Sequence, residues 1–137
     1  MDLNKIENYE ILYRVVRKSY PDAFVNGKPT AALFMDAEGA SVERDGDRSE
    51  SEIIACCRKR FGRRDDYLTS VKITAGECRA VNTYPNPVHN HKNKYHAEIH
   101  DSEQLIEIGL LKAMQLAAIC QVVNIIDVPS DSSNSSE

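Results

Sequence analysis

The pattern of apolar and polar positions predicts strands in four stretches of the chain. The first covers residues 11–16, where β-branched and aromatic side chains are enriched. Three further stretches, residues 40–43, 67–75 and 95–100, follow the period of two that is typical of half-buried strands. Residues 78–81 either continue the third of these strands or form a bulge in it.

Two other stretches carry helix signals. Ser49 and Glu52 form a capping-box pattern ahead of apolar residues at helical spacing, and Gly62 is a natural end. A second helix is predicted from about Ser102 to Cys120, because the polar residues at its start favour helix initiation. Its buried face would carry a stripe of apolar side chains, namely Leu105, Ile108, Leu111 and Ala118, widened by Ile106, Leu110 and Met114.

The remaining segments complete a single domain over residues 1–128. Two prolines within residues 84–87 predict irregular backbone there. Residues 122–128 are either a last strand or a continuation of the second helix, and Pro129 ends them. Residues 129–137 are rich in serine and acid, so we expect a disordered tail. Without strict strand–helix–strand alternation, the predicted class is α+β, a mostly antiparallel sheet of about four or five strands with about two helices packed on it.

Composition narrows the class of protein. The 137 residues carry a net charge of -4, which argues against a nucleic-acid partner because dedicated nucleic-acid binders are basic overall. The four cysteines lack the spacing of a zinc knuckle, and we expect free thiols in a cytoplasmic protein. No apolar run approaches the roughly 20 residues that span a bilayer, so we expect no membrane association.

All four histidines fall within residues 89–100, and imidazole both titrates near neutral pH and binds metals. If residues 95–100 form a strand, His96, Glu98 and His100 share one face of it. One hypothesis is therefore a zinc or similar metal site, with Glu98 as a further ligand or as the group that orients a histidine. The metal ligands would come from His89, His91, His96 and His100.

Two other functional interpretations of this segment are open. His96, poised by Glu98, would serve general acid–base chemistry. Alternatively, Asn93 and Tyr95, with the neighbouring histidine and lysine side chains, would contact a phosphate or nucleotide. The simplest alternative is a solvated polar loop without a function of its own.

Arginines provide the next candidates. Arg14 lies inside an apolar strand, where burial of a charge without a partner is costly. It would grip a phosphate or carboxylate, or it would be solvated on an outer face shared with Leu12 and Val16. Arg58 and Arg60 belong to a basic cluster at the end of the first predicted helix, where cations complement the helix dipole. The same cluster would also suit an acidic docking partner.

The order of these features resembles a functionally uncharacterised family of small bacterial proteins. The pattern consists of Leu12-Tyr13-Arg14, a glycine loop before Phe34, Ser41-Val42 and His96-Ala97. The chain also resembles RES-type and other ADP-ribosyl-transferring toxins. This second resemblance implies an early-strand arginine that holds NAD, a serine or tyrosine on a middle strand and a late glutamate, here Arg14, Ser41 and Glu98. The chain has no Trp and lacks the Gly-Gly-Arg-Trp-Asn segment of RES-type proteins.

The chain lacks a Walker loop, a dinucleotide-binding glycine motif and an esterase elbow, which argues against the common NTPases, dinucleotide enzymes and esterases. Two functional hypotheses remain. The first is a small binding or accessory module that contacts an operon-encoded protein partner through residues 89–100. The second is a small enzyme that uses Arg14, His96 and Glu98 on a nucleotide or phosphorylated substrate, by ADP-ribosyl transfer or metal-assisted hydrolysis. The absence of these signatures favours the module. A homodimer would use the apolar surface of residues 102–120 or 122–128.

Overall fold

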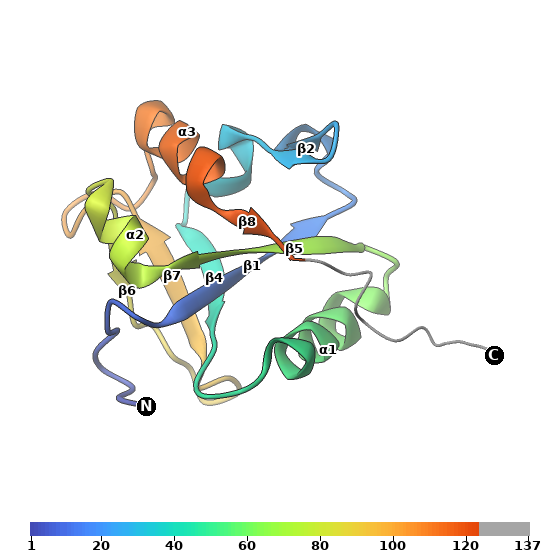
Figure 1. Cartoon of the computed structure of the whole chain (residues 1–137), viewed down its shortest axis with the longest axis horizontal. Coiled ribbons are helices and arrows are strands. Elements are labelled where there is room, and N and C mark those ends of the chain that lie inside the picture. The colour runs from blue at the N-terminus through green and yellow to red at the C-terminus, as the bar shows by residue number, and fades with distance from the viewer. Residues whose placement is uncertain (124–137) are drawn as a thin grey trace.

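The computed structural model describes residues 1–123, which form an α+β fold around a six-stranded sheet (Figure 1). Neighbouring strands are antiparallel throughout, in the order β6-β7-β4-β1-β5-β8. The strands are β1 (Ile11–Arg17), β4 (Ala40–Arg44), β5 (Tyr67–Thr74), β6 (Tyr84–Asn86), β7 (His96–His100) and β8 (Gln121–Val122). The predicted class and the mostly antiparallel sheet are confirmed, although the sheet has more strands than we predicted.

Three α-helices and several short elements connect these strands. The helices are α1 (Glu50–Gly62), α2 (Ala75–Ala80) and α3 (Leu110–Ile119). Between β1 and β4 the chain forms two 3-10 turns and a small hairpin, namely η1 (Pro21–Ala23), β2 (Phe24–Val25), β3 (Lys28–Pro29) and η2 (Ala31–Phe34). The prediction of two helices was therefore one too few, because α2 was not foreseen.

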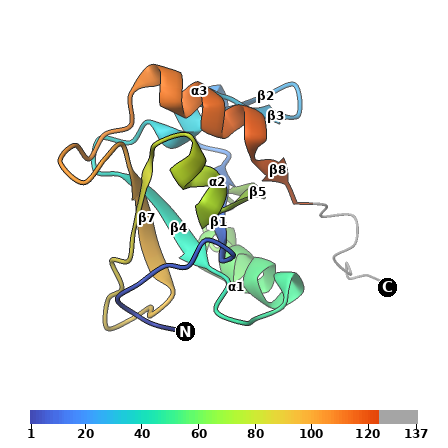
Figure 2. The ribbon, with the colours of Figure 1, turned by 60° about the vertical axis from the view of Figure 1, so that its left-hand side comes forward.

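The helices cover both faces of the sheet, with α1 on one side and α3 on the other (Figures 1 and 2). Because successive residues of a strand point to opposite faces, β1 contributes to both layers. Leu12 and Val16 are buried in the larger core, which also contains residues of α2, α3 and η2. Tyr13 is buried in a smaller core with Ile53, Ile54 and Cys57 of α1. Leu12 and Val16 thus lie on a buried face rather than the solvated outer face that we considered for Arg14.

The sheet opens between its two central strands. β1 pairs with β5 along its whole length, from Ile11 opposite Thr74 to Arg17 opposite Tyr67. With β4, however, β1 pairs only through Leu12 opposite Arg44 and Tyr13 opposite Glu43. Continued pairing in this register would place later residues of β1 opposite the start of β4, but the strands diverge instead. This divergence, hereafter the split, creates the space for the candidate site.

Capping boxes fix the starts of two helices. The Ser49 hydroxyl accepts a hydrogen bond from the Glu52 amide, and the Glu52 carboxylate accepts one from the Ser49 amide, so the predicted start of α1 is confirmed. Thr74 and Glu77 make the same reciprocal pair at α2. The prediction that residues 78–81 continue or bulge a strand is therefore wrong, since this cap starts a helix directly after β5.

The second predicted helix begins later than the sequence suggests. The Ser102 hydroxyl accepts hydrogen bonds from the amides of Gln104 and Leu105, which closes a turn rather than a helix. The Asp101 carboxylate then accepts a hydrogen bond at 3.0 Å from the Gly109 amide, just before α3 starts. The polar residues that we interpreted as a helix cap thus stabilise the loop before α3.

The predicted buried stripe of that helix is also wrong in most positions. Ile108, Ala113 and Leu116 are fully buried, whereas Leu111 is 76% exposed. The other apolar side chains that are exposed in this region are Leu105, Ile106, Leu110, Met114, Ala118 and Ile119. Since α3 is apolar on nearly every side, hydrophobic spacing alone did not identify its buried face. The predicted homodimer through this surface stays a prediction.

The predicted irregular backbone at residues 84–87 is wrong for most of this stretch. Pro85 lies in β6 opposite Ile99, so residues 84–86 form a strand rather than irregular backbone. A proline is tolerated there because β6 is an edge strand and needs no donor on its outer side.

β8 confirms the strand alternative for residues 121–122, while residues 124–128 and the predicted tail, residues 129–137, lie outside the described part. Among residues 1–123, no helix has the length and apolar character needed to cross a membrane.

Candidate functional site at the sheet split

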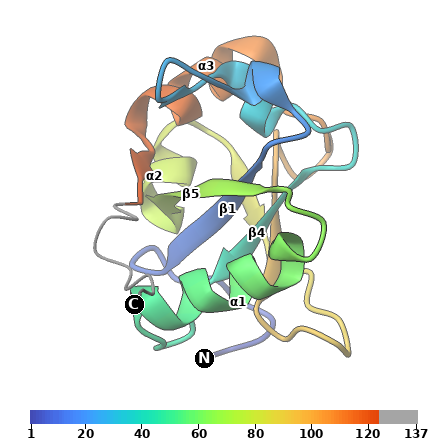
Figure 3. The ribbon, with the colours of Figure 1, turned by 90° about the vertical axis from the view of Figure 1, so that its right-hand side faces the viewer.

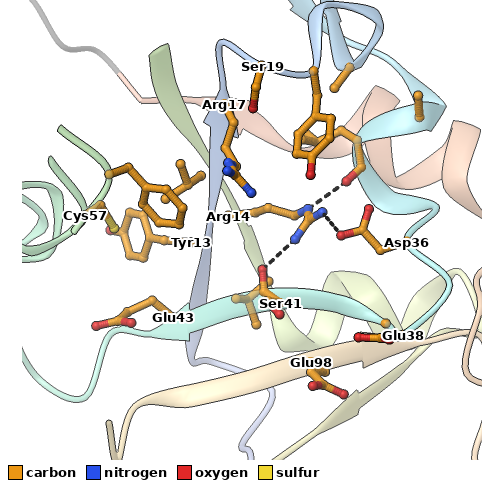
Figure 4. A pocket seen from close by; sticks show the side chains of 18 of the residues that line it. Tyr13, Arg14, Arg17, Ser19, Asp36, Glu38, Ser41, Glu43, Cys57 and Glu98 are labelled. Atoms are coloured by element: carbon orange, nitrogen blue, oxygen red, sulfur yellow. Dashed lines mark hydrogen bonds and ion pairs between the residues drawn. The ribbon is translucent and has the colours of Figure 1, made fainter. Parts of the chain in front are cut away.

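A cavity of about 800 Å³ lies at the split between β1 and β4 (Figure 4). Its walls come from these two strands, the C-terminal half of α1, the η1–η2 region and β7. The four residues that we predicted as catalytic, Arg14, Ser41, His96 and Glu98, all line it. Residues separated by as many as 84 positions in sequence therefore meet in one concave site.

Arg14 bridges the split. Its Nε donates to the Leu33 carbonyl at 2.7 Å, and its Nη1 donates to the Ser41 carbonyl at 2.8 Å. Its Nη2 donates to the Asp36 carboxylate at 2.9 Å. The guanidinium thus replaces part of the strand pairing that β4 lacks. A guanidinium has about five N–H groups in total, so these contacts leave donors for a ligand.

The pairing of β4 with β7 aligns the other candidates. Ser41 lies opposite Glu98 and Glu43 opposite His96 in this antiparallel ladder. Directly opposed residues and residues two apart in one strand share a face of the sheet, so these four side chains form one polar cluster. On the opposite face of β7, Ala97 and Ile99 are fully buried in the larger core.

Glu98 is held between two histidines. The Nε2 atom of His100 lies 2.8 Å from one Glu98 carboxylate oxygen, and that of His96 lies 3.6 Å from the other. His100 is buried, whereas the Glu98 side chain remains 23% exposed. Gly39 packs against this pair with a φ of +95°, and a Cβ there would come within 2.8 Å of the His100 ring. A glycine at this position therefore permits both the turn and the approach.

Acidic groups outnumber arginines in the cavity lining. The carboxylates are those of Asp22, Asp36, Glu38, Glu43 and Glu98, and the arginines are Arg14, Arg17 and Arg60. All three arginines are already paired, Arg14 with Asp36 at 2.9 Å, Arg17 with Asp66 at 2.6 Å and Arg60 with Glu43 at 3.3 Å. Such a lining favours a ligand that carries both a positive group and groups that accept hydrogen bonds.

Thiolate chemistry does not suit this cavity. Cys57 lines it, but burial raises the pKa of the Cys57 thiol to about 11, and the nearby Glu43 carboxylate acts in the same direction. The thiol is therefore protonated near neutral pH and is a poor nucleophile. All four cysteines are free of disulfides, as predicted.

A second, more open groove adjoins the cavity. It has a volume of about 880 Å³ and lies between the end of α1 and the loop that joins β6 to β7. Three of the four residues that we predicted for binding, Asn93, Tyr95 and Arg60, line this groove. The fourth, Arg58, lies outside both cavities. Its guanidinium carbon lies 5.7 Å from the centre of the Tyr67 ring.

The four histidines do not form one ligand set. His89 and His91 are exposed in the β6–β7 loop, and His96 and His100 lie at opposite ends of β7. Within residues 1–123, no three His, Cys, Asp or Glu side chains are arranged to hold a metal ion. The described residues therefore do not provide the ligand set that the zinc hypothesis requires.

Sequence reasoning missed two residues that organise the site. Asp36 binds Arg14, and Arg48 binds Glu43 at 3.0 Å while its guanidinium stacks 3.5 Å from the centre of the Tyr95 ring. Both lie in turns, where no periodic pattern marks a side chain as pointing inward. No protein-family model, curated protein or solved structure matches the chain.

Proposed function

We propose that this chain is a small enzyme that binds NAD⁺ in the cavity at the split and transfers its ADP-ribose group. The observation that carries the proposal is the convergence of Arg14, Ser41 and Glu98 in one cavity. These are the three residues that the resemblance to ADP-ribosyl-transferring proteins implies. The cavity volume of about 800 Å³ falls within the range of roughly 300–1,000 Å³ typical of small-molecule sites.

The charges in the cavity suit this ligand. Arg14 has N–H groups that do not bond to its protein partners, and these would bind the pyrophosphate or a ribose hydroxyl. The carboxylates of Glu38 and Glu98 would favour the positively charged nicotinamide ring and the positive charge that develops on the ribose. Their excess over arginines would be unfavourable for a ligand that is purely anionic.

The proposed reaction breaks the glycosidic bond between ribose C1′ and the nicotinamide nitrogen. The bonding electrons leave with nicotinamide, which becomes neutral, and a hydroxyl group of water or an acceptor attacks C1′. The Glu98 carboxylate stabilises the cationic ribose and takes the proton of the attacking hydroxyl. His100 holds this carboxylate in place through the 2.8 Å contact.

The test is release of nicotinamide from NAD⁺, separated chromatographically and quantified over time. Glu98→Gln should lower the rate at least about a hundredfold, because a general base and a charge are both removed. The matched control is Glu107→Gln, an exposed residue outside both cavities, which should act like the wild type. Wild-type protein that releases no nicotinamide, or a Glu98→Gln variant with full activity, would refute the proposal.

The binding-module hypothesis is the second candidate function. It is favoured by the exposed segment with His91 and Lys92, which forms one side of the open groove. The two hypotheses are compatible, because the groove shares part of its lining with the cavity.

A further inference from the structure

The open groove leads into the cavity at the split. It is lined on one side by the C-terminal half of α1 and on the other by the β6–β7 loop, which lie beside each other in Figure 3. Groove and cavity share Ser41, Glu43, Arg60, Phe61 and His96. A chain bound in the groove would therefore present a side chain to the cavity that contains Glu98.

The two chain segments that contribute to the sides of the groove are basic although the protein has a net charge of -4. Residues 58–64, at the end of α1, contain no acid, and their cations are Arg58, Lys59, Arg60, Arg63 and Arg64. Arg60 lines the groove, and the other four are its neighbours in sequence. Residues 87–95 of the loop also contain no acid, and their cations are Lys92 and Lys94, of which Lys92 lines the groove. This concentration of positive charge at one groove predicts a negatively charged occupant.

The groove already binds one carboxylate, that of Glu43. Its oxygens accept hydrogen bonds from Arg48 at 3.0 Å, from Arg60 at 3.3 Å and from the side-chain amide of Asn93 at 2.9 Å. The Glu43 side chain is only 5% exposed, so its charge is largely satisfied inside the protein. The donors of this groove are thus arranged for carboxylates.

Other exposed cations near the groove make no hydrogen bond to Glu43. Lys92 in the groove, and Arg63 and Arg64, which follow the groove-lining Arg60 and Phe61 in sequence, are exposed and make no ion pair with any residue of the described range 1–123. At exposed positions each contact with a partner's carboxylate contributes about 0.2–1 kcal/mol, so several are needed for specific binding. A short segment with several acidic residues satisfies that requirement.

We infer that the groove binds an acidic segment of a partner protein and that this segment carries the group to be modified. The transfer step in this inference rests on the proposed function, but binding of the segment does not. A nucleic acid fits less well, because a long polyanion would also meet the acidic remainder of a protein of net charge -4. An acidic protein segment meets only the groove.

The test is fluorescence anisotropy with a labelled ten-residue peptide of alternating Glu and Ser, without NAD⁺. Wild-type protein should bind this peptide, with an affinity that falls as salt rises. The double variant Lys92→Glu/Arg63→Glu should bind about tenfold more weakly or worse, because two attractions become repulsions. The matched control is Lys28→Glu, an exposed lysine of β3 outside both cavities, which should bind like the wild type.

The possible outcomes separate this inference from the proposed function. Equal binding by wild type and the double variant, or tighter binding of a ten-residue thymidine oligonucleotide than of the peptide, would overturn the inference. Nicotinamide release by the wild type is measured in a separate sample. Peptide binding without release would refute only the proposed function, and release without peptide binding would refute only the acidic partner.

Discussion

Arg44 and Arg14 come from neighbouring strands and have opposite surroundings. Arg44 lies at the closed end of the β1–β4 pair and is fully buried. Its guanidinium binds both carboxylate oxygens of Glu10, at 2.8 and 2.9 Å, and the Lys5 carbonyl at 2.7 Å. Arg14 lies at the open end, where its side chain is 12% exposed and faces the cavity.

This difference separates a structural arginine from a candidate ligand-binding one. The partner of Arg44 is a buried carboxylate, so the pair is shielded from solvent and ligand alike. Arg14 binds two backbone carbonyls and the largely exposed Asp36, whose side chain is 54% exposed. Removing Glu10 should therefore affect folding, whereas changing Arg14 should affect ligand binding more than folding.

The largest expected effect is loss of stability on breaking the buried pair. Glu10→Ala should lower the free energy of unfolding by about 3–5 kcal/mol, because it leaves the Arg44 charge buried without its partner. Urea denaturation measures this change. The matched control is Glu7→Ala, whose carboxylate is 40% exposed and 3.8 Å from Lys5, and it should change stability by about 0.5 kcal/mol or less. An equal loss of unfolding free energy in the two variants would show that Arg44 can stay buried without the Glu10 carboxylate at little cost.

The second effect concerns Arg14. Arg14→Lys should lower stability by about 1–3 kcal/mol, because one ammonium group cannot satisfy both carbonyls and Asp36. It should also abolish the increase in melting temperature that we expect when NAD⁺ is added to the wild type. Arg79→Lys is the control, since Arg79 likewise binds a backbone carbonyl, that of Ile6, far from the cavity. An Arg14→Lys protein that keeps the NAD⁺ response would remove Arg14 from the proposed site.

The third effect tests how Glu98 is positioned at the open end. His100→Leu should lower kcat for nicotinamide release about tenfold with little change in KM, since the carboxylate loses the imidazole that holds it. His100→Gln should recover most of this loss, because its amide can donate from a similar place. If the two variants are equally impaired, His100 has only a packing role.

The smallest effect is a pH dependence at the closed end. Burial alone would raise the pKa of Glu10, but the hydrogen bonds from Arg44 and the Glu7 amide outweigh burial and lower that pKa below its ordinary value of 4.5. A lowered pKa in the folded state stabilises the protein above pH 4.5, and this contribution is lost as pH falls through the folded-state value.

Urea denaturation of the wild type at a series of pH values from neutral to acid tests this dependence. The free energy of unfolding should fall below about pH 4.5, by roughly 1.4 kcal/mol for each unit by which the pKa is lowered. The acid-dependent part should be smaller in Glu10→Gln, which cannot ionise at this position. Identical acid slopes in both proteins would show that other carboxylates account for the loss.

Local signals predicted the elements whose start is encoded in a few adjacent residues. The Ser49–Glu52 capping box and the alternation in β1 and β7 correctly located α1 and these strands. The same capping chemistry at Thr74 was overlooked in favour of strand continuation. For α3 the spacing failed, since nearly every position is apolar and only tertiary packing selects Ala113 and Leu116 for burial.

The site was predicted residue by residue but not as an arrangement. The charged Arg14 within an apolar strand and the pairing of histidines with Glu98 were visible in the sequence. Their convergence depends on the register of β4 against β7 and on the split between β1 and β4, which arise from long-range pairing. Asp36 and Arg48 enter the site from turns, so no periodicity revealed them.

The most direct test is an NMR titration that observes the arginine side-chain Nε–H signals as NAD⁺ is added to the wild-type protein. The Arg14 signal should shift saturably, together with the backbone amides of Ser41 and Glu98, while the buried Arg44 signal stays in place. An Arg14 signal that does not move at saturating NAD⁺, or shifts confined to residues outside the cavity, would contradict the proposal that the split is a dinucleotide site.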